Sequence, residues 1–110
     1  MLTFKELQAL ADETAVYPDN GNNITYPVLG LCGEAGELAN KVKKVFRDHG
    51  GVMSDEVKAA LAGELGDVLW YCGAVANELG ADLDAVADAV AAKLRTRKIE
   101  GKLHGSGDNR

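Results

Sequence analysis

The chain has 110 residues and a formal net charge of −5, and 46% of its residues are hydrophobic but only 5% are aromatic. This length suits one domain, 1–110, whose core is built from Ala, Val and Leu. The acidic balance argues against a nucleic-acid partner, because binding a phosphate backbone requires a basic surface. No apolar run is long enough to cross a membrane and no segment resembles a signal peptide, so we expect a cytoplasmic protein.

The first half of the chain predicts two helices separated by a loop. Thr3 and Glu6 have the spacing of a capping box, which predicts a helix from position 4 to about position 16. Turn-forming residues then fill 17–23, which predicts a loop. A second helix is expected from Pro27, a residue tolerated in a first helical turn, to about His49.

The second half predicts two more helices and a polar tail. Ser54 is a suitable N-cap for a third helix, which should end at Gly80. Asp82 can cap a fourth helix, which carries an apolar stripe and ends in basic residues. The tail, 101–110, is rich in glycine and polar residues. Because no strand-like alternation occurs, the sequence predicts an all-α fold of four helices arranged as a bundle.

Two short segments, 33–37 and 63–67, are near copies of each other. The first contains Glu34 and Glu37, and the second contains Glu64 and Asp67. Their three-residue spacing places each pair on one helix face. Both pairs lie about equally far from the turn between the second and third helices, so they reach the same height in an antiparallel hairpin. We therefore expect the four carboxylates to face one another across a single groove.

The acids on each helix also have an ordinary explanation. No other charged residue occurs between positions 59 and 77, so Glu64 and Asp67 form either a metal site or part of a buried ion pair. On the second helix the acids are followed by Lys41 and Lys44, a pattern that a solvent-facing stripe also shows. Each segment carries two glycines, which cost roughly 0.5–1 kcal/mol each inside a helix. We expect a bound metal and a neighbouring helix to need that space.

The matched heights favour a metal site, and the ligand type indicates which metal. Neither acidic pair contains a histidine, and His49 and His104 lie far from both along the chain. An all-oxygen ligand set suits Mg²⁺, for which Mn²⁺ can substitute, rather than zinc or iron. Because Mg²⁺ is commonly shared between protein carboxylates and substrate phosphates, the expected chemistry involves phosphate groups.

Around these acids the chain resembles the MazG-like members of the all-α nucleoside triphosphate pyrophosphohydrolase superfamily. Their signature is an E-x-x-E pair followed one helix later by an E-x-x-D pair, and 34–37 and 64–67 match it. The wider similarity covers segments 30–38, 64–71, 93–97 and 105–110. The resemblance implies hydrolysis of a nucleoside triphosphate, often a deoxynucleotide, at the α–β bond, which yields the monophosphate and pyrophosphate.

The resemblance also implies that the four acids bind Mg²⁺ and are the catalytic residues. We prefer Glu34 as the base that accepts a proton from the attacking water. Basic residues of the second and fourth helices are expected to hold phosphates, or else to be solvated or to complement a helix dipole. Tyr71 either hydrogen-bonds the ligand or packs in the core, and two tail residues either close over the nucleotide or fray. The substrate-binding candidates are Lys41, Lys44, Tyr71, Lys93, Arg97, Asp108 and Asn109.

Two other functions stay open on the sequence alone. One is a nonenzymatic helical interaction module with a stabilising divalent cation, and the other is a hydrolase that releases the γ-phosphate. We also expect a homodimer or homotetramer that completes the bundle, which the resemblance implies as well. The third helix is apolar around most of its circumference, and one chain offers few elements to cover it.

Overall fold

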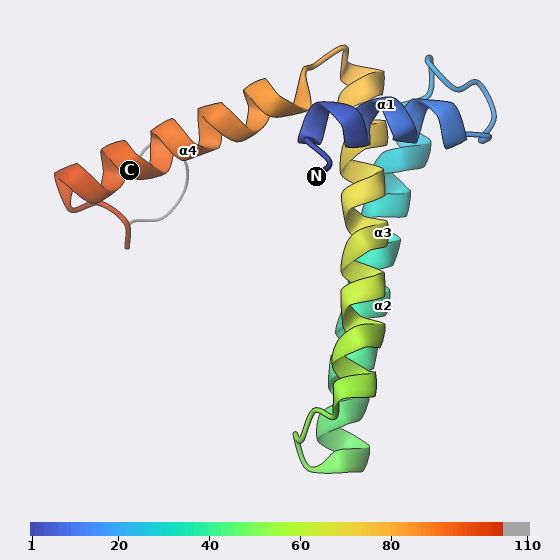
Figure 1. Cartoon of the computed structure of the whole chain (residues 1–110), viewed down its shortest axis with the longest axis vertical. Coiled ribbons are helices and arrows are strands. Elements are labelled where there is room, and N and C mark those ends of the chain that lie inside the picture. Colours follow the sequence, from blue (N-terminus) through green and yellow to red (C-terminus); the bar gives the residue numbers. More distant parts are fainter. Residues whose placement is uncertain (105–110) are drawn as a thin grey trace.

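The computed structural model describes residues 1–104, which form four α-helices and no strand (Figure 1). The helices are α1 (Phe4–Thr14), α2 (Thr25–His49), α3 (Asp55–Leu79) and α4 (Leu83–Glu100). The predicted all-α class and the four predicted helices are confirmed. Their bounds differ little from expectation, because α1 ends two residues early and α2 begins two residues before Pro27.

Local signals in the sequence set the helix ends. The Thr3 hydroxyl accepts a hydrogen bond from the Glu6 N–H, and the Glu6 carboxylate accepts one from the Thr3 N–H, which completes the predicted capping box. The Ser54 hydroxyl accepts from the Val57 N–H and caps α3. Gly80 ends α3 with a φ of 66°, a left-handed conformation that glycine adopts without strain.

The two long helices, α2 and α3, form an antiparallel hairpin, and α1 lies across its open end (Figure 1). The crossing is close, because a Cβ built on Gly73 of α3 would lie 3.1 Å from the Cβ of Ala11. Ala11 is fully buried there. Trp70 adds an anchor, since its indole N–H donates to the Thr14 hydroxyl at 2.8 Å.

Helix α4 contacts α1 near its start and then points away from the hairpin (Figure 1). Gln8 of α1 fixes that start, because its amide donates to the Ala81 carbonyl at 2.7 Å and accepts from the Leu83 N–H at 2.8 Å. The four helices therefore do not close around one core within a single chain. The Cα radius of gyration is 16.8 Å, against about 13 Å for a compact domain of this length.

The core of the single chain is correspondingly small. The buried hydrophobic residues in the described part are Ala11, Tyr17, Pro27, Val45, Ala74 and Ala76. Most of them lie where α1 and the loop before α2 meet the hairpin. No helix within residues 1–104 combines the length and the hydrophobicity needed to span a bilayer.

Candidate active site

Three carboxylates from the two hairpin helices meet midway along the hairpin. Glu34 on α2 and Glu64 and Asp67 on α3 each offer an oxygen, and these oxygens lie within 4.8 Å of one another. We call these residues the acid cluster. Glu34 and Glu64 are half-buried, whereas Asp67 is exposed. The fourth predicted acid, Glu37, is exposed and lies outside the cluster, although its charge reaches Glu34 and Lys41.

The members of the acid cluster perturb one another. The pKa of Glu34 is raised, first by burial and then by a hydrogen bond with Glu64 and by the charge of Asp67. The pKa of Glu64 is lowered instead, because the Lys41 ammonium lies 2.7 Å from its Oε1. The same contact raises the pKa of Lys41. The cluster therefore concentrates negative charge that one ammonium only partly offsets.

An open pocket of about 340 Å³ adjoins the acid cluster and is lined by Glu34, Asp67, Trp70 and Tyr71. Its volume falls within the range of small-molecule pockets, roughly 300–1,000 Å³. The Trp70 and Tyr71 rings meet edge to face with centroids 4.9 Å apart. Burial, and then the nearby Tyr26 and Glu34, raise the pKa of Tyr71. Tyr71 is half-buried and also lines the pocket beside the acids. Its hydrogen bond to a ligand stays a prediction.

Gly30 allows Tyr71 to take this position. A Cβ built on Gly30 would lie 2.1 Å from Cε1 of the Tyr71 ring, so any side chain there would displace the ring. The sequence placed Gly30 only within a segment of family resemblance and did not indicate this contact. Its only local signal was a glycine within a helix.

The four glycines beside the acids have no such neighbour. A Cβ on any of them would meet nothing within 4 Å in the described structure. The described chain therefore places no helix of its own in this space, and a bound metal or a helix of a second copy there stays a prediction. The space lies open beside the acids of both helices. The glycines concerned are Gly33, Gly36, Gly63 and Gly66.

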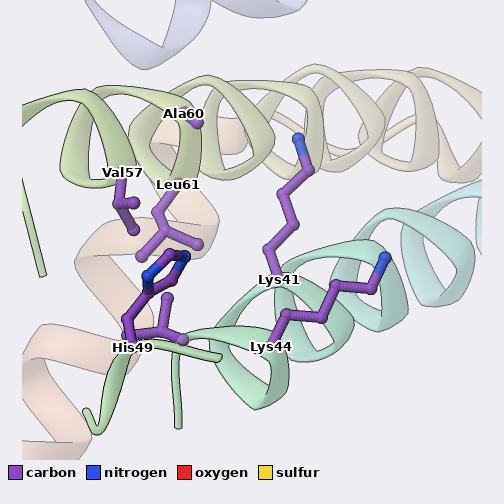
Figure 2. Close-up of a pocket in the computed structure, with 7 residues that line it drawn as sticks. Lys41, Lys44, His49, Val57, Ala60 and Leu61 are labelled. Carbon is purple, nitrogen blue, oxygen red and sulfur yellow. The ribbon is translucent and has the colours of Figure 1, made fainter. Parts of the chain in front are cut away.

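Lys41 and Lys44 follow the acids along α2 and line a second pocket of about 180 Å³, together with His49 and Leu61 among others (Figure 2). In Figure 2, Lys41 reaches from α2 toward α3, whereas Lys44 extends along α2. Both predicted phosphate-binding lysines therefore lie on the side of the acid cluster that faces the hairpin turn.

Two further candidates, on α4, are not brought to the acid cluster within the described part of one chain. Lys93 and Arg97 belong to the C-terminal half of α4, which points away from the hairpin (Figure 1). Arg97 is also buried, with 5% of its surface exposed. Asp108 and Asn109 lie outside the described residues.

Glu78, near the end of α3, fixes the loop before α2. Its carboxylate accepts hydrogen bonds from the Tyr17 hydroxyl at 2.5 Å, the Gly21 N–H at 2.9 Å and the Asn23 N–H at 3.0 Å. These donors lower the pKa of Glu78, while burial and Glu78 raise the pKa of Tyr17 to about 12. Tyr17 in turn stacks on Tyr26 with ring centroids 4.7 Å apart.

Glu78 thereby holds Tyr17 and, through it, Tyr26, whose nearby hydroxyl adds to the effect of burial in raising the pKa of the pocket residue Tyr71. The sequence did not single out this residue. The only sequence signal for this contact was an acid at the end of an apolar stretch, in a chain that also contains a polar loop. A solvated acid at a helix end gives the same pattern.

The comparisons with known proteins agree with this architecture. Residues 25–100 match the family described as the MazG nucleotide pyrophosphohydrolase domain. The match begins where α2 begins and ends where α4 ends, so it contains the hairpin and all four predicted acids. The chain therefore belongs to the MazG nucleotide pyrophosphohydrolase family. Membership implies a nucleotide substrate, and the family is generally dependent on divalent metal ions.

The chain is also similar to a phage protein. It is 46% identical to the Gene 37 protein of Mycobacterium phage L5 over 108 residues, which cover 94% of this chain and 95% of the relative. The name of that relative states no activity. No solved structure gives a significant match to the chain.

Proposed function

We propose that the protein hydrolyses a nucleoside triphosphate or deoxynucleoside triphosphate at the α–β bond, releasing the monophosphate and pyrophosphate. The observation that carries this proposal is the acid cluster, in which two helices bring three carboxylate oxygens within 4.8 Å of one another. The family match supports the class of reaction, and the closeness of the carboxylates supports the acid cluster as its proposed location.

The acid cluster fits a hard divalent cation, which we propose to be Mg²⁺. Its donors are all carboxylate oxygens, the ligands that Mg²⁺ and Mn²⁺ prefer. Burial raises the pKa of Glu34 first, followed by its hydrogen bond with Glu64 and by the repulsion of the neighbouring carboxylates, which a cation would relieve. We propose Glu37 as a further ligand, because it follows Glu34 by about one turn on the same helix face. When bound, Mg²⁺ would neutralise triphosphate oxygens and lower the pKa of a bound water.

The chain's own residues would bind the substrate and move the proton. Glu34 lines the pocket, and its raised pKa brings it closer to the range in which a general base works well. It would accept the proton of the attacking water as the α–β anhydride bond breaks and pyrophosphate leaves. Lys41 and Lys44 would bind phosphate oxygens, while Trp70 and Tyr71 would contact the nucleoside.

Product analysis tests this reaction. A panel of canonical and modified triphosphates is incubated with the protein and Mg²⁺, and the products are separated by ion-exchange chromatography. We expect monophosphate and pyrophosphate in equal amounts, and no turnover in EDTA. Diphosphate with free phosphate would instead establish γ-cleavage. An intact protein that binds Mn²⁺ but turns over no triphosphate would favour the interaction module.

We further propose that the protein works as a homodimer or homotetramer. Its accessible surface is 7659 Å², whereas a compact monomer of this mass exposes about 5,800 Å². The difference of about 1,800 Å² exceeds the roughly 800 Å² that each partner buries in a standard interface. Much of the apolar stripe of α4 is exposed, including Val86, Val90 and Leu94.

An assembly would also allow basic residues of α4 to bind substrate phosphates. Because α4 points away from its own hairpin, Lys93 would approach the acid cluster of another copy rather than its own, whereas Arg97 is buried in the single chain. Light scattering at low micromolar concentration tests the assembly. We expect at least twice the monomer mass, and a stable, active monomer would refute the proposal.

A further inference from the structure

Lys41 occupies the edge of the acid cluster that a cation would otherwise occupy. Its ammonium lies 2.7 Å from Oε1 of Glu64, with 41% of the Lys41 side chain and 15% of the Glu64 side chain exposed. The lysine belongs to α2 and the glutamate to α3, so the ion pair bridges the hairpin. The same Glu64 oxygen cannot bind a metal ion at full strength while it holds this ammonium.

Lys44 provides an internal comparison, because it carries the same charge one turn further along α2. It extends along its own helix in Figure 2 and makes no ion pair with an acid among residues 1–104. Lys41 and Lys44 nevertheless line the same pocket. An ammonium released from Glu64 would therefore remain beside Lys44, on the side of the cluster that faces the hairpin turn.

We propose that Lys41 is an internal counter-cation that competes with the divalent metal for Glu64 and moves to a substrate phosphate when the metal binds. Metal binding would then be weak in the free protein and stronger in the presence of a triphosphate, which gives the released ammonium a new anionic partner. Lys41 would couple the two binding events as a positioning residue. The second half of this inference rests on the proposed function, whereas the competition for Glu64 does not.

The competition is tested by Mn²⁺ binding without nucleotide, measured by electron paramagnetic resonance of the free ion. Lys41→Met removes the competitor, and Lys44→Met is the matched control that removes the same charge without the contact to Glu64. We expect Lys41→Met to bind Mn²⁺ about fivefold more tightly than wild type, in line with the strength of an exposed ion pair. Lys44→Met should change the affinity by less than about twofold, because its charge is more distant and screened.

Equal gains in the two variants would show only a general charge effect and would overturn the proposal. An Mn²⁺ affinity of Lys41→Met at or below that of wild type would do the same. The thermal midpoint in EDTA gives an independent reading. It should fall more in Lys41→Met than in Lys44→Met, because the carboxylates then face one another without a bridging cation. An equal or smaller fall would contradict the bridging role.

The coupling is tested by repeating the Mn²⁺ titration with an α,β-imido deoxynucleoside triphosphate, whose α–β bridge resists hydrolysis. The analogue should strengthen Mn²⁺ binding in wild type and do so at least about threefold less in Lys41→Met. Identical enhancement in both proteins would refute the transfer of Lys41 to phosphate. A protein that shows the Mn²⁺ competition but hydrolyses no triphosphate would leave the competition standing and refute the proposed function.

Discussion

Helix α3 carries glutamates in two opposite settings, Glu64 midway along its length and Glu78 near its end. Glu78 accepts three hydrogen bonds, from Tyr17, Gly21 and Asn23, all within 3.0 Å. Glu64 instead faces other carboxylates and has one ammonium as its partner. The two side chains are chemically identical, and both are half-buried. What differs is whether the chain itself supplies the donors that a carboxylate needs.

That difference separates an acid that stabilises the fold from the acids that we propose as metal ligands. The donors around Glu78 lower its pKa, so its charge stabilises the loop and needs nothing from outside the chain. Within the acid cluster the pKa of Glu34 is raised, first by burial, then by its hydrogen bond with Glu64 and by the neighbouring carboxylate charges. A cluster left with uncompensated negative charge is suited to an external cation, which is why the acid cluster and not Glu78 carries the proposed function.

The two regions meet at the aromatic wall of the pocket. Glu78 holds the loop that leads to Tyr26, and Tyr26 lies close enough to Tyr71 to raise its pKa. Tyr71 lines the same pocket as Glu34. Substitutions near Glu78 should therefore change the stability of the protein more than the shape of the pocket. Substitutions in the acid cluster should mainly change the rate of hydrolysis.

The largest effect is expected for Asp67→Asn. Replacing a proposed metal ligand should lower kcat more than about 100-fold at saturating Mg²⁺ while leaving the helical circular dichroism unchanged. Asp88→Asn, which neutralises an exposed acid on α4, is the control and should stay within about twofold. An Asp67→Asn protein that retains more than about a tenth of the wild-type rate would remove this acid from the site.

The second-largest effect is expected at the contact between Gly30 and the Tyr71 ring, at the wall of the pocket. Gly30→Ala should push the Tyr71 ring from the pocket wall, at a cost of about 1–3 kcal/mol in stability and about tenfold in kcat/KM. Gly33→Ala, whose new Cβ meets nothing within 4 Å in the described chain, should instead stabilise the helix by about 0.5–1 kcal/mol. The fluorescence of Trp70, the sole tryptophan, should change in the first variant alone. Similar unfolding free energies for the two variants would refute the Gly30–Tyr71 contact.

The helices and most of the acid cluster were predictable because they depend on local rules. Caps such as Ser54 act on adjacent backbone groups, and the meeting of Glu34 with Asp67 follows from equal rise along two helices joined by a short turn. Side-chain direction was less predictable. Glu37 shares a helix face with Glu34, yet the described structure leaves it outside the cluster, because helix periodicity fixes a face and not a rotamer.

Contacts between distant segments were not predictable from the sequence. Glu78 binds a loop more than 50 residues away in the chain, through backbone N–H groups that any residue type would offer. The fit of Gly30 against Tyr71 and the direction of α4 likewise depend on how helices cross. For the glycines of the acidic segments, the sequence pattern suggested close packing, but the single chain leaves the space beside them open.

The third prediction concerns stability near Glu78. Glu78→Gln should lower the thermal midpoint by several degrees at neutral pH. The amide of Gln has one uncharged acceptor oxygen, whereas the Glu78 carboxylate accepts the three hydrogen bonds with two charged oxygens. The folded pKa of Glu78 lies below its ordinary value of 4.5, so its contribution is complete above that value and is lost as pH falls through the folded pKa. Melting curves of wild type and variant should therefore converge in acid. A constant difference at every pH would contradict this origin.

The smallest effect, and the one of opposite sign, is expected for Glu34→Gln in EDTA. The folded pKa of Glu34 lies above its ordinary value of 4.5, so the folded state binds its proton more tightly than the unfolded state does. Ionised Glu34 therefore destabilises the metal-free protein above its folded pKa, and Gln should raise the thermal midpoint at neutral pH.

As pH falls through the folded pKa toward 4.5, wild-type Glu34 becomes protonated and this advantage of the variant should disappear. Glu37→Gln, on the same helix but outside the acid cluster, is the matched control and should raise the midpoint less. Adding Mg²⁺ should reverse the order, because the wild-type carboxylate then gains a cationic partner that Gln cannot bind as well. A midpoint of Glu34→Gln below that of wild type in EDTA at neutral pH would show that Glu34 is held by donors within the chain, as Glu78 is, and that the contrast between the two regions is mistaken.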